Sequence, residues 1–247
     1  MPTTDSLTKL TLPDLQDAFA MFEQRVEKPG GPYDMARGLF EKGCEIEGCV
    51  LFLATWNTGC FRFVKNFHPQ SLRDAWKELA SQFALLKEQN IQSIDISTHR
   101  DTIAKTFTRL SEVSGVLYTG AAKLMHLKLP SLFVPWDEYI RGEKAKRYYD
   151  ALHRVAPGKW YRLRYPYLSS GEGYLSFLRD MQNRVRDLSY PVDSKPLAKA
   201  IDEFNFVNVT LPIQNQENEE REKKRLEEKK KRLEEKKRKH EEAEKLD

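Results

Sequence analysis

Apolar side chains recur every three or four positions along most of the first 204 residues, the period of an amphipathic α-helix. In 12–26 the apolar stripe consists of Leu15, Phe19, Phe22 and Val26. Comparable stripes occupy 46–67, 71–86, 98–110, 169–188 and 194–204. Only 204–211, FNFVNVTL, alternates in the manner of a strand. The pattern predicts an all-α body in which 204–211 is the candidate β-strand.

Short polar motifs predict where these helices begin. Thr11 with Asp14 forms a capping-box pattern, in which two side chains satisfy each other's backbone N–H groups. Similar pairs precede other stripes: Ser71 with Asp74, Thr98 with Asp101, Ser169 with Glu172, and Ser194 with Pro196. His68-Pro69 predicts the end of the apolar helix at 46–67, because a residue that precedes proline disfavours the helical conformation.

The C-terminal segment has a different composition. The heptapeptide KKRLEEK occurs at 223–229 and again at 230–236, so that Leu226 and Leu233 lie seven residues apart. One apolar position per heptad is too few for a coiled coil, whereas the Glu-to-Lys/Arg pairs at i,i+4 each stabilise a lone helix by about 0.2–0.5 kcal/mol. We divide the chain into a helical body, 1–212, and a charged single helix, 213–247, and expect a monomer. A nucleic-acid-binding tail stays open as an alternative.

Charge and composition exclude several classes of protein. The 41 Lys and Arg nearly balance the 37 Asp and Glu, so only a local patch could argue for a nucleic-acid partner. The longest apolar run, CVLFLATW, is too short to cross a bilayer. No secretory signal precedes Cys44, Cys49 and Cys60, which we expect to be reduced and mostly buried. No zinc spacing or nucleotide-binding loop occurs, so we expect neither metal nor cofactor.

The stretch KLPSLFVPWDEYIRG, 128–142, places one carboxylate, Asp137, between an apolar, proline-bracketed loop and a helix start. Two interpretations are open. Asp is common at helix starts, where it caps the first turn. Alternatively, Trp136 and Phe133 could desolvate Asp137 and strengthen its interaction with a developing cation, as a catalytic carboxylate requires.

The preceding residues bear on that choice. In 110–141 a helix ends at a turn that contains Gly115, and a second helix is expected to begin near Thr119 and Gly120. Small residues permit close packing, and the backbone N–H groups of a helix start can hold a phosphate.

This unit resembles the helix-hairpin-helix DNA glycosylase superfamily, whose hairpin reads Leu-Pro-Gly-Val-Gly-x-x-Thr-Ala ahead of a catalytic Asp. Here SGVLYTGAA stands for the hairpin and Asp137, 19 positions after Tyr118, for the acid. The leading Pro is missing, and Val116 or Leu117 replaces the second Gly. The resemblance implies a two-lobed helical domain and double-stranded DNA as the partner. It further implies a cytoplasmic, nucleoid-associated location.

The resemblance also assigns candidate roles. Asp137 stands as the catalytic acid, and Tyr118 occupies the slot that holds a Schiff-base lysine in bifunctional members, which favours a monofunctional enzyme. Lys123 lies five residues later; we do not expect it to be the nucleophile, although its side chain could reach the pocket or a phosphate. Gly115, Thr119 and Gly120 would contact the DNA backbone.

Other residues are candidates on their own chemistry. Trp56 and Asn57 could supply stacking and base-edge hydrogen bonds, and Trp136 would join them in a base pocket. Trp56 and Asn57 could equally be a core tryptophan and a helix-terminal asparagine. In 156–168 Lys159, Arg162 and Arg164 alternate with aromatic residues, which suits phosphate contact or simple core packing. Arg141 could pair with Asp137 or hold a phosphate.

Three functions follow. The first is a monofunctional glycosylase that removes a modified or mismatched base. The second is a thymine-hypermodification pyrophosphorylase-type enzyme on the same fold. The third is a non-catalytic DNA-binding module, which predicts a weak cavity and an Asp137 that pairs with Arg141 or only caps a helix. Both enzyme hypotheses predict that Asp137 faces a cleft lined by Tyr118, Trp136 and Trp56.

Overall fold

The computed structural model describes residues 9–56, 67–141, 169–191 and 195–244, with the side chains of the last helix described as far as residue 236. Helices account for the secondary structure of this part of the chain, which contains no β-strand. The all-α prediction is therefore confirmed. The elements are α1 (Leu12–Arg25), α2 (Pro32–Glu41), α3 (Glu45–Trp56), α5 (Pro69–Glu78), α6 (Ala80–Leu86), α7 (Arg100–Ser111), α8 (Leu117–Lys128), α9 (Glu138–Arg141), α11 (Gly171–Val185), α12 (Leu197–Asn205), the π-helical turn η1 (Phe206–Thr210) and α13 (Leu211–Glu244).

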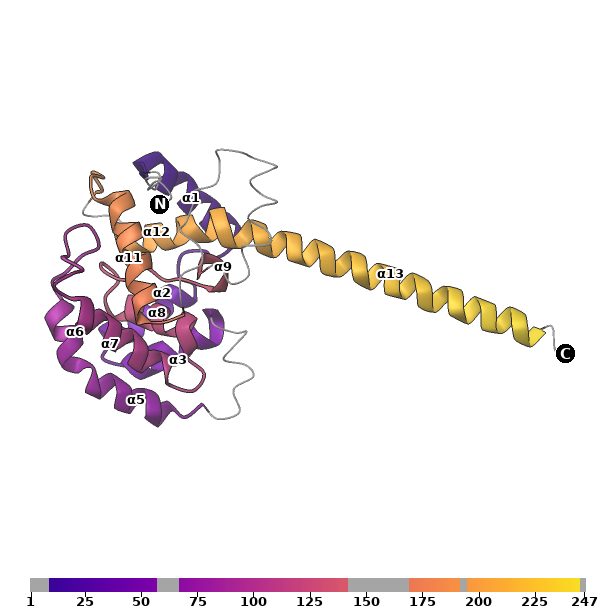
Figure 1. Cartoon of the computed structure of the whole chain (residues 1–247), viewed down its shortest axis with the longest axis horizontal. Coiled ribbons are helices and arrows are strands. Elements are labelled where there is room, and N and C mark those ends of the chain that lie inside the picture. The colour runs from indigo at the N-terminus through magenta and orange to yellow at the C-terminus, as the bar shows by residue number, and fades with distance from the viewer. Residues whose placement is uncertain (1–8, 57–66, 142–168, 192–194, 245–247) are drawn as a thin grey trace, which may run out of the picture.

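The helices of the body pack around one main apolar core (Figure 1). α7 packs against both α8 and α11, α2 packs against α3, and α1 packs against α12. The stripe predicted for the first helix takes part, because Leu15 and Phe22 are buried in this core. Burial of such side chains stabilises the fold by about 1.5–3 kcal/mol each.

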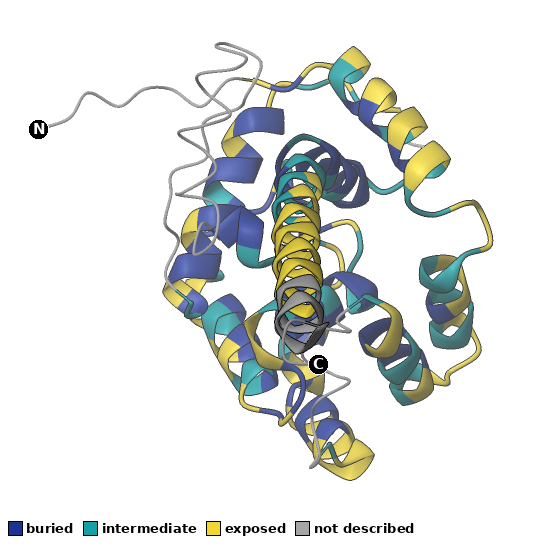
Figure 2. Cartoon of the chain, turned by 90° about the vertical axis from the view of Figure 1, so that its right-hand side faces the viewer, coloured by how far each residue is buried: buried dark blue, intermediate teal, exposed yellow. Residues whose placement is uncertain are grey.

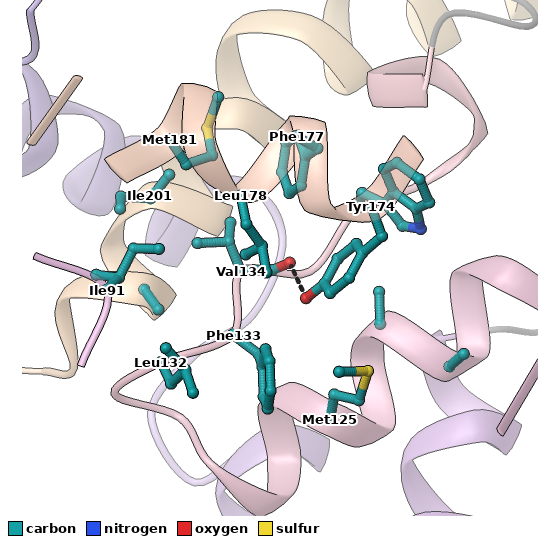
Figure 3. Close-up of a cluster of buried hydrophobic side chains, with 14 of the residues drawn as sticks. Ile91, Met125, Leu132, Phe133, Val134, Tyr174, Phe177, Leu178, Met181 and Ile201 are labelled. Carbon is teal, nitrogen blue, oxygen red and sulfur yellow. Dashed lines mark hydrogen bonds between the residues drawn. The ribbon is translucent and has the colours of Figure 1, made fainter. Parts of the chain in front are cut away.

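The loop that leads to Asp137 runs through the core instead of over the surface. Leu132, Phe133, Val134 and Trp136 are all fully buried. A buried loop needs internal partners for its backbone polar groups. The hydroxyl of Tyr174 on α11 donates to the carbonyl oxygen of Val134 at 3.0 Å (Figure 3), and the carbonyl oxygen of Ser131 accepts from Ile91 N–H at 3.0 Å. These bonds fix the path of the loop and therefore the position of Asp137.

Some predicted helix starts are correct and others are wrong. The Thr11–Asp14 capping box is present at α1. α5 begins two residues before Ser71, at Pro69, because proline is well suited to the first turn of a helix. Thr98 does not cap α7; its hydroxyl donates to Asp95 at 2.7 Å. The cap of α11 is Ser170, one residue beyond Ser169. Pro196 immediately precedes α12, and Ser194 lies outside the described residues.

The predicted strand at 204–211 is wrong. These residues form the end of α12, the turn η1 and the first residue of α13, which follow one another without a break. The β-branched side chains of Val207, Val209 and Thr210 favour a strand locally. All three are buried, so packing against the body outweighs that preference.

The long helix α13 leaves the body and projects away from it (Figure 1). Its first turns contact the body, and Ile213 is almost completely buried. Farther along, Leu226 and Leu233 are exposed, as is the rest of the described surface from residue 222 to residue 236 (Figure 2). The boundary predicted from the sequence after residue 212, between the body and the charged tail, falls inside the first turn of α13, which begins at Leu211.

Of the cysteines, Cys49 is buried, and burial raises the pKa of its thiol. Cys44 is exposed, contrary to the expectation that the cysteines are mostly buried. Cys60 lies outside the described residues, as do residues 57–66 of the helix predicted at 46–67. Among the described residues, no helix is both long and apolar enough to cross a membrane.

Candidate functional site

Asp137 lies where the buried loop meets the short helix α9. Its Oδ1 accepts the backbone N–H groups of Tyr139 at 2.9 Å and Ile140 at 2.8 Å, so Asp137 caps α9. Its Oδ2 accepts a hydrogen bond from the hydroxyl of Thr210 at 2.6 Å. The capping interpretation is therefore correct as far as it goes, but the second oxygen is held by a residue from a distant part of the chain.

Burial raises the pKa of Asp137 above its ordinary value. The hydrogen bonds from Thr210 and Ile140 and the positive charge of Lys123 oppose this effect without cancelling it. Desolvation disfavours the charged form of a carboxyl group, whereas donors and nearby cations favour it. The carboxylate is thus held in a partly dry environment by three hydrogen bonds.

Asp137 lines a cleft of about 560 Å³. Eight of its lining residues are apolar or aromatic and nine are charged or polar, and they come from several helices. The lining residues are Phe22, Phe52, Thr55, Trp56, Thr119, Lys123, Pro135, Trp136, Asp137, Glu138, Tyr139, Ile140, Arg141, Lys199, Asp202, Phe206 and Gln214. This size is typical of sites for small organic ligands or for one extruded nucleotide.

Both tryptophans predicted for the pocket line the cleft. Trp136 is completely buried, and its indole N–H donates to the carbonyl oxygen of Tyr118 at 3.2 Å. Trp56, the last residue of α3, stacks on Phe22 with ring centroids 5.9 Å apart. Asn57 lies outside the described residues.

Lys123 reaches the cleft from α8. Its ammonium donates to the carbonyl oxygen of Trp56, and it lies 5.9 Å from the centroid of the Trp56 ring. The side chain therefore connects α8 to the end of α3 and places a positive charge near Asp137. This arrangement suits a structural and electrostatic role.

Arg141 lines the cleft and is largely buried. Its guanidinium donates to the hydroxyl of Ser169 at 2.6 Å and lies over the rings of Tyr118 and Trp136, at 5.6 and 5.8 Å from their centroids. Among the described residues, the carboxylate of Asp137 forms no ion pair, so the pairing of Asp137 with Arg141 is absent there.

The turn between α7 and α8 has an unusual backbone. Gly115 has φ +87° and Leu117 has φ +53°. A positive φ is ordinary for glycine but costs energy for leucine. α8 begins at Leu117, two residues before the expected start near Thr119. Thr119 faces the cleft, whereas Gly120 is buried inside the helix pair.

Tyr118 is partly exposed and stacks on Phe107 at a centroid distance of 6.4 Å. It is not among the residues that line the cleft, contrary to the expectation that it would form part of the wall. Lys159, Arg162 and Arg164 lie outside the described residues.

Sequence reasoning missed the contribution of α12 and the turns that follow it. Lys199, Asp202, Phe206 and Gln214 all line the cleft, and Thr210 binds Asp137. Neighbouring members of this set are three or four residues apart, so a helix through 204–211 would have placed each beside the next on successive turns.

Lys199 on α12 is a buried cation that lines the cleft. Its ammonium lies 3.0 Å from Asp202 and 3.7 Å from Glu203, and 4.8 Å from the ring centroids of both Phe22 and Tyr33. Burial alone would lower the pKa of Lys199, but the two carboxylates outweigh burial and raise it. Lys199 is therefore a fixed positive charge and not an amine nucleophile.

His126 on α8 is completely buried and has partners at both ring nitrogens. Nδ1 lies 2.6 Å from the carbonyl oxygen of Phe133, and Nε2 lies 3.0 Å from the hydroxyl of Tyr33. Since the carbonyl can only accept, Nδ1 carries the proton and Nε2 accepts from Tyr33. Burial lowers the pKa of His126 to about 4. It helps to hold the buried loop in place.

Comparison with known protein families, with curated proteins and with solved structures found no match. In the part of the chain that the structure describes, no cluster of three or more His, Cys, Asp or Glu side chains is arranged to hold a metal ion.

Proposed function

We propose that this protein binds double-stranded DNA and removes a modified or mismatched base by cleavage of its N-glycosidic bond. The observation that carries the proposal is the buried, hydrogen-bonded carboxyl group of Asp137 beside a cleft of about 560 Å³ that Trp56 and Trp136 also line. Cleavage of this bond builds positive charge on the sugar, which a nearby carboxylate stabilises or uses to activate water. A target base must leave the helical stack to be reached, and such a cleft could receive it.

The environment of Asp137 supports this chemistry. Burial strengthens the attraction between the carboxylate and a developing cation, because fewer water dipoles screen it. Three hydrogen bonds keep the group in one orientation, and a carboxylate with two oxygens offers about four lone pairs. With respect to the described residues, one acceptor position therefore stays available for a water molecule or the sugar.

The two alternatives keep some support. The role of Asp137 as a helix cap agrees with a non-catalytic DNA-binding module, whereas the large cleft does not. A pyrophosphorylase-type reaction on hypermodified thymine would use the same cleft, whose cations Lys123 and Arg141 suit an anionic group.

A base-release assay tests the proposal. Duplexes that carry a panel of damaged, mismatched and modified bases are incubated with the protein and then treated with alkali, which cuts the strand at abasic sites. We expect release of at least one base by the wild type and a loss of at least about 100-fold in Asp137→Asn. Asparagine is also a good helix cap, so this variant preserves α9.

Asp101→Asn provides the matched control, because Asp101 is an exposed carboxylate in the first turn of α7. It should retain full activity. DNA binding without release, unchanged in Asp137→Asn, would refute the proposal in favour of the binding module. Direct strand cleavage that borohydride traps as a covalent adduct would instead assign a lyase activity and bring Lys123 back as the nucleophile.

A further inference from the structure

Thr210 departs from the usual behaviour of a hydroxyl in a helix. Helical Ser and Thr side chains commonly bond back to the carbonyl oxygen four residues earlier. Thr55, Thr106 and Ser176 do so, at 2.9, 2.8 and 3.0 Å. The hydroxyl of Thr210, which is completely buried, donates instead to Oδ2 of Asp137, 73 residues away in sequence.

The π-helical turn η1 brings Thr210 to this position. The N–H of Leu211 donates to the carbonyl oxygen of Phe206, five residues earlier, as in a π-helix. Two features of the sequence favour the wider turn. Pro212 has no N–H to continue the α-helical pattern, and the side-chain amide of Asn208 donates to the carbonyl oxygen of Phe204 at 2.9 Å.

The wider turn also keeps one side of this long helical segment directed at the cleft. Asp202 and Gln214 both line the cleft and are separated by twelve residues. In a regular α-helix they would point about 120° apart, and one extra residue in the turn reduces this angle to about 20°. π-helical turns inside α-helices occur frequently at functional sites.

We propose that Thr210, presented by η1, is the positioning residue of the Asp137 carboxyl group: its hydroxyl holds Oδ2 in one orientation beside the cleft. Its importance for catalysis rests on the proposed function, whereas its effect on Asp137 does not. A hydroxyl donates a stronger hydrogen bond to a charged carboxylate oxygen than to a neutral carboxylic acid, so the bond favours the charged form. It acts against burial, which raises the pKa of Asp137.

The other charged groups that line the cleft also act on Asp137. They are Lys123 from α8, Glu138 and Arg141 from α9, and Lys199 and Asp202 from α12. Lys123 lowers the pKa of Asp137 and Asp202 raises it. The experiment therefore changes Thr210 alone and leaves these five groups in place.

The acid dissociation constant of Asp137 is measured by NMR titration of its side-chain carboxyl carbon in the full chain. Thr210→Val removes the hydroxyl at nearly constant shape, and Thr210→Ser keeps it. We expect the dissociation constant to fall about tenfold in Thr210→Val and to stay within about twofold of wild type in Thr210→Ser. Thr106→Val, which removes a hydroxyl that bonds back within α7, is the matched control and should leave Asp137 unchanged.

An unchanged dissociation constant in Thr210→Val, or a Thr210→Ser variant that behaves like the valine variant, would overturn the proposal. If Thr210→Val does not fold, the wild type gives a second test. The resonances of Thr210 must then titrate with the same midpoint as the carboxyl carbon of Asp137, and independent titration would overturn the proposal. No DNA is needed for either measurement, so a negative base-release assay would refute the proposed enzyme and leave this result standing.

Discussion

His126 makes the stability of this protein sensitive to mild acid. The pKa of a histidine in an unfolded chain is about 6.5, whereas burial lowers the pKa of His126 to about 4 in the folded protein. Between these two values the unfolded state binds a proton that the folded state does not. The stabilisation is therefore complete above about pH 6.5 and is lost as the pH falls toward 4. From these two pKa values, the contribution of His126 lowers the free energy of unfolding by about 2 kcal/mol at pH 5 and by about 3 kcal/mol below pH 4, relative to neutral pH.

The perturbation that isolates this effect is His126→Asn. The asparagine amide can take the place of Nδ1 and donate to Phe133, but it does not titrate. The loss of the Tyr33 hydrogen bond should cost about 1–3 kcal/mol at pH 7.5. Urea unfolding of both proteins at pH 7.5 and pH 5 gives four free energies of unfolding. We expect the difference in free energy of unfolding between wild type and variant to be about 2 kcal/mol smaller at pH 5 than at pH 7.5.

Comparison with the variant is necessary because other groups act in the opposite direction. Burial raises the pKa values of Glu27, Asp137 and Glu203, so these carboxyl groups favour folding as the pH falls. Their contribution is common to both proteins and cancels in the difference. A constant gap between pH 7.5 and pH 5, or an NMR titration of His126 in the folded protein near 6.5, would refute the reasoning.

Two further predictions concern packing and the tail. Gly171→Ala should destabilise the protein by about 1–3 kcal/mol, because the new Cβ would lie 2.9 Å from the carbonyl oxygen of Ala104; Gly38→Ala, which meets nothing within 4 Å inside α2, should instead stabilise it by up to about 1 kcal/mol. Equal urea midpoints for these two variants would contradict the packing of α11 on α7. Removal of residues 223–247 should leave the urea midpoint of the body unchanged and reduce only the helical circular-dichroism signal, since the described side chains beyond residue 222 are exposed. A lower midpoint in the truncated chain would mean that the tail supports the body.

Much of the local structure could be predicted from the sequence. The first helix and its cap were predicted correctly because Thr11 and Asp14 lie within one turn of each other. The errors at Ser71 and Thr98 have local causes as well: Pro69 starts its helix earlier, and Asp95 takes the hydroxyl of Thr98. Two candidate interpretations of Asp137 could be stated, but not decided, from residues 128–142 alone.

The composition of the cleft could not be predicted in the same way. Asp137 and Thr210 are 73 residues apart, and no local pattern specifies that they meet. Phe206 and Thr210 were missed because the β-branched residues in 204–211 suggested a strand, and burial against the body makes that segment helical.

The sequence by itself determined the helical period, the capping box at Thr11 and the charged character of the C-terminal segment. These features depend on hydrogen bonds and side-chain spacings within about one or two helical turns, so a short window contains all of their partners. Only the tertiary structure decided that the loop before Asp137 is buried, that η1 replaces a strand, and that Thr210 reaches the carboxylate. These features depend on which distant surfaces exclude water together, and that is settled only when the helices pack.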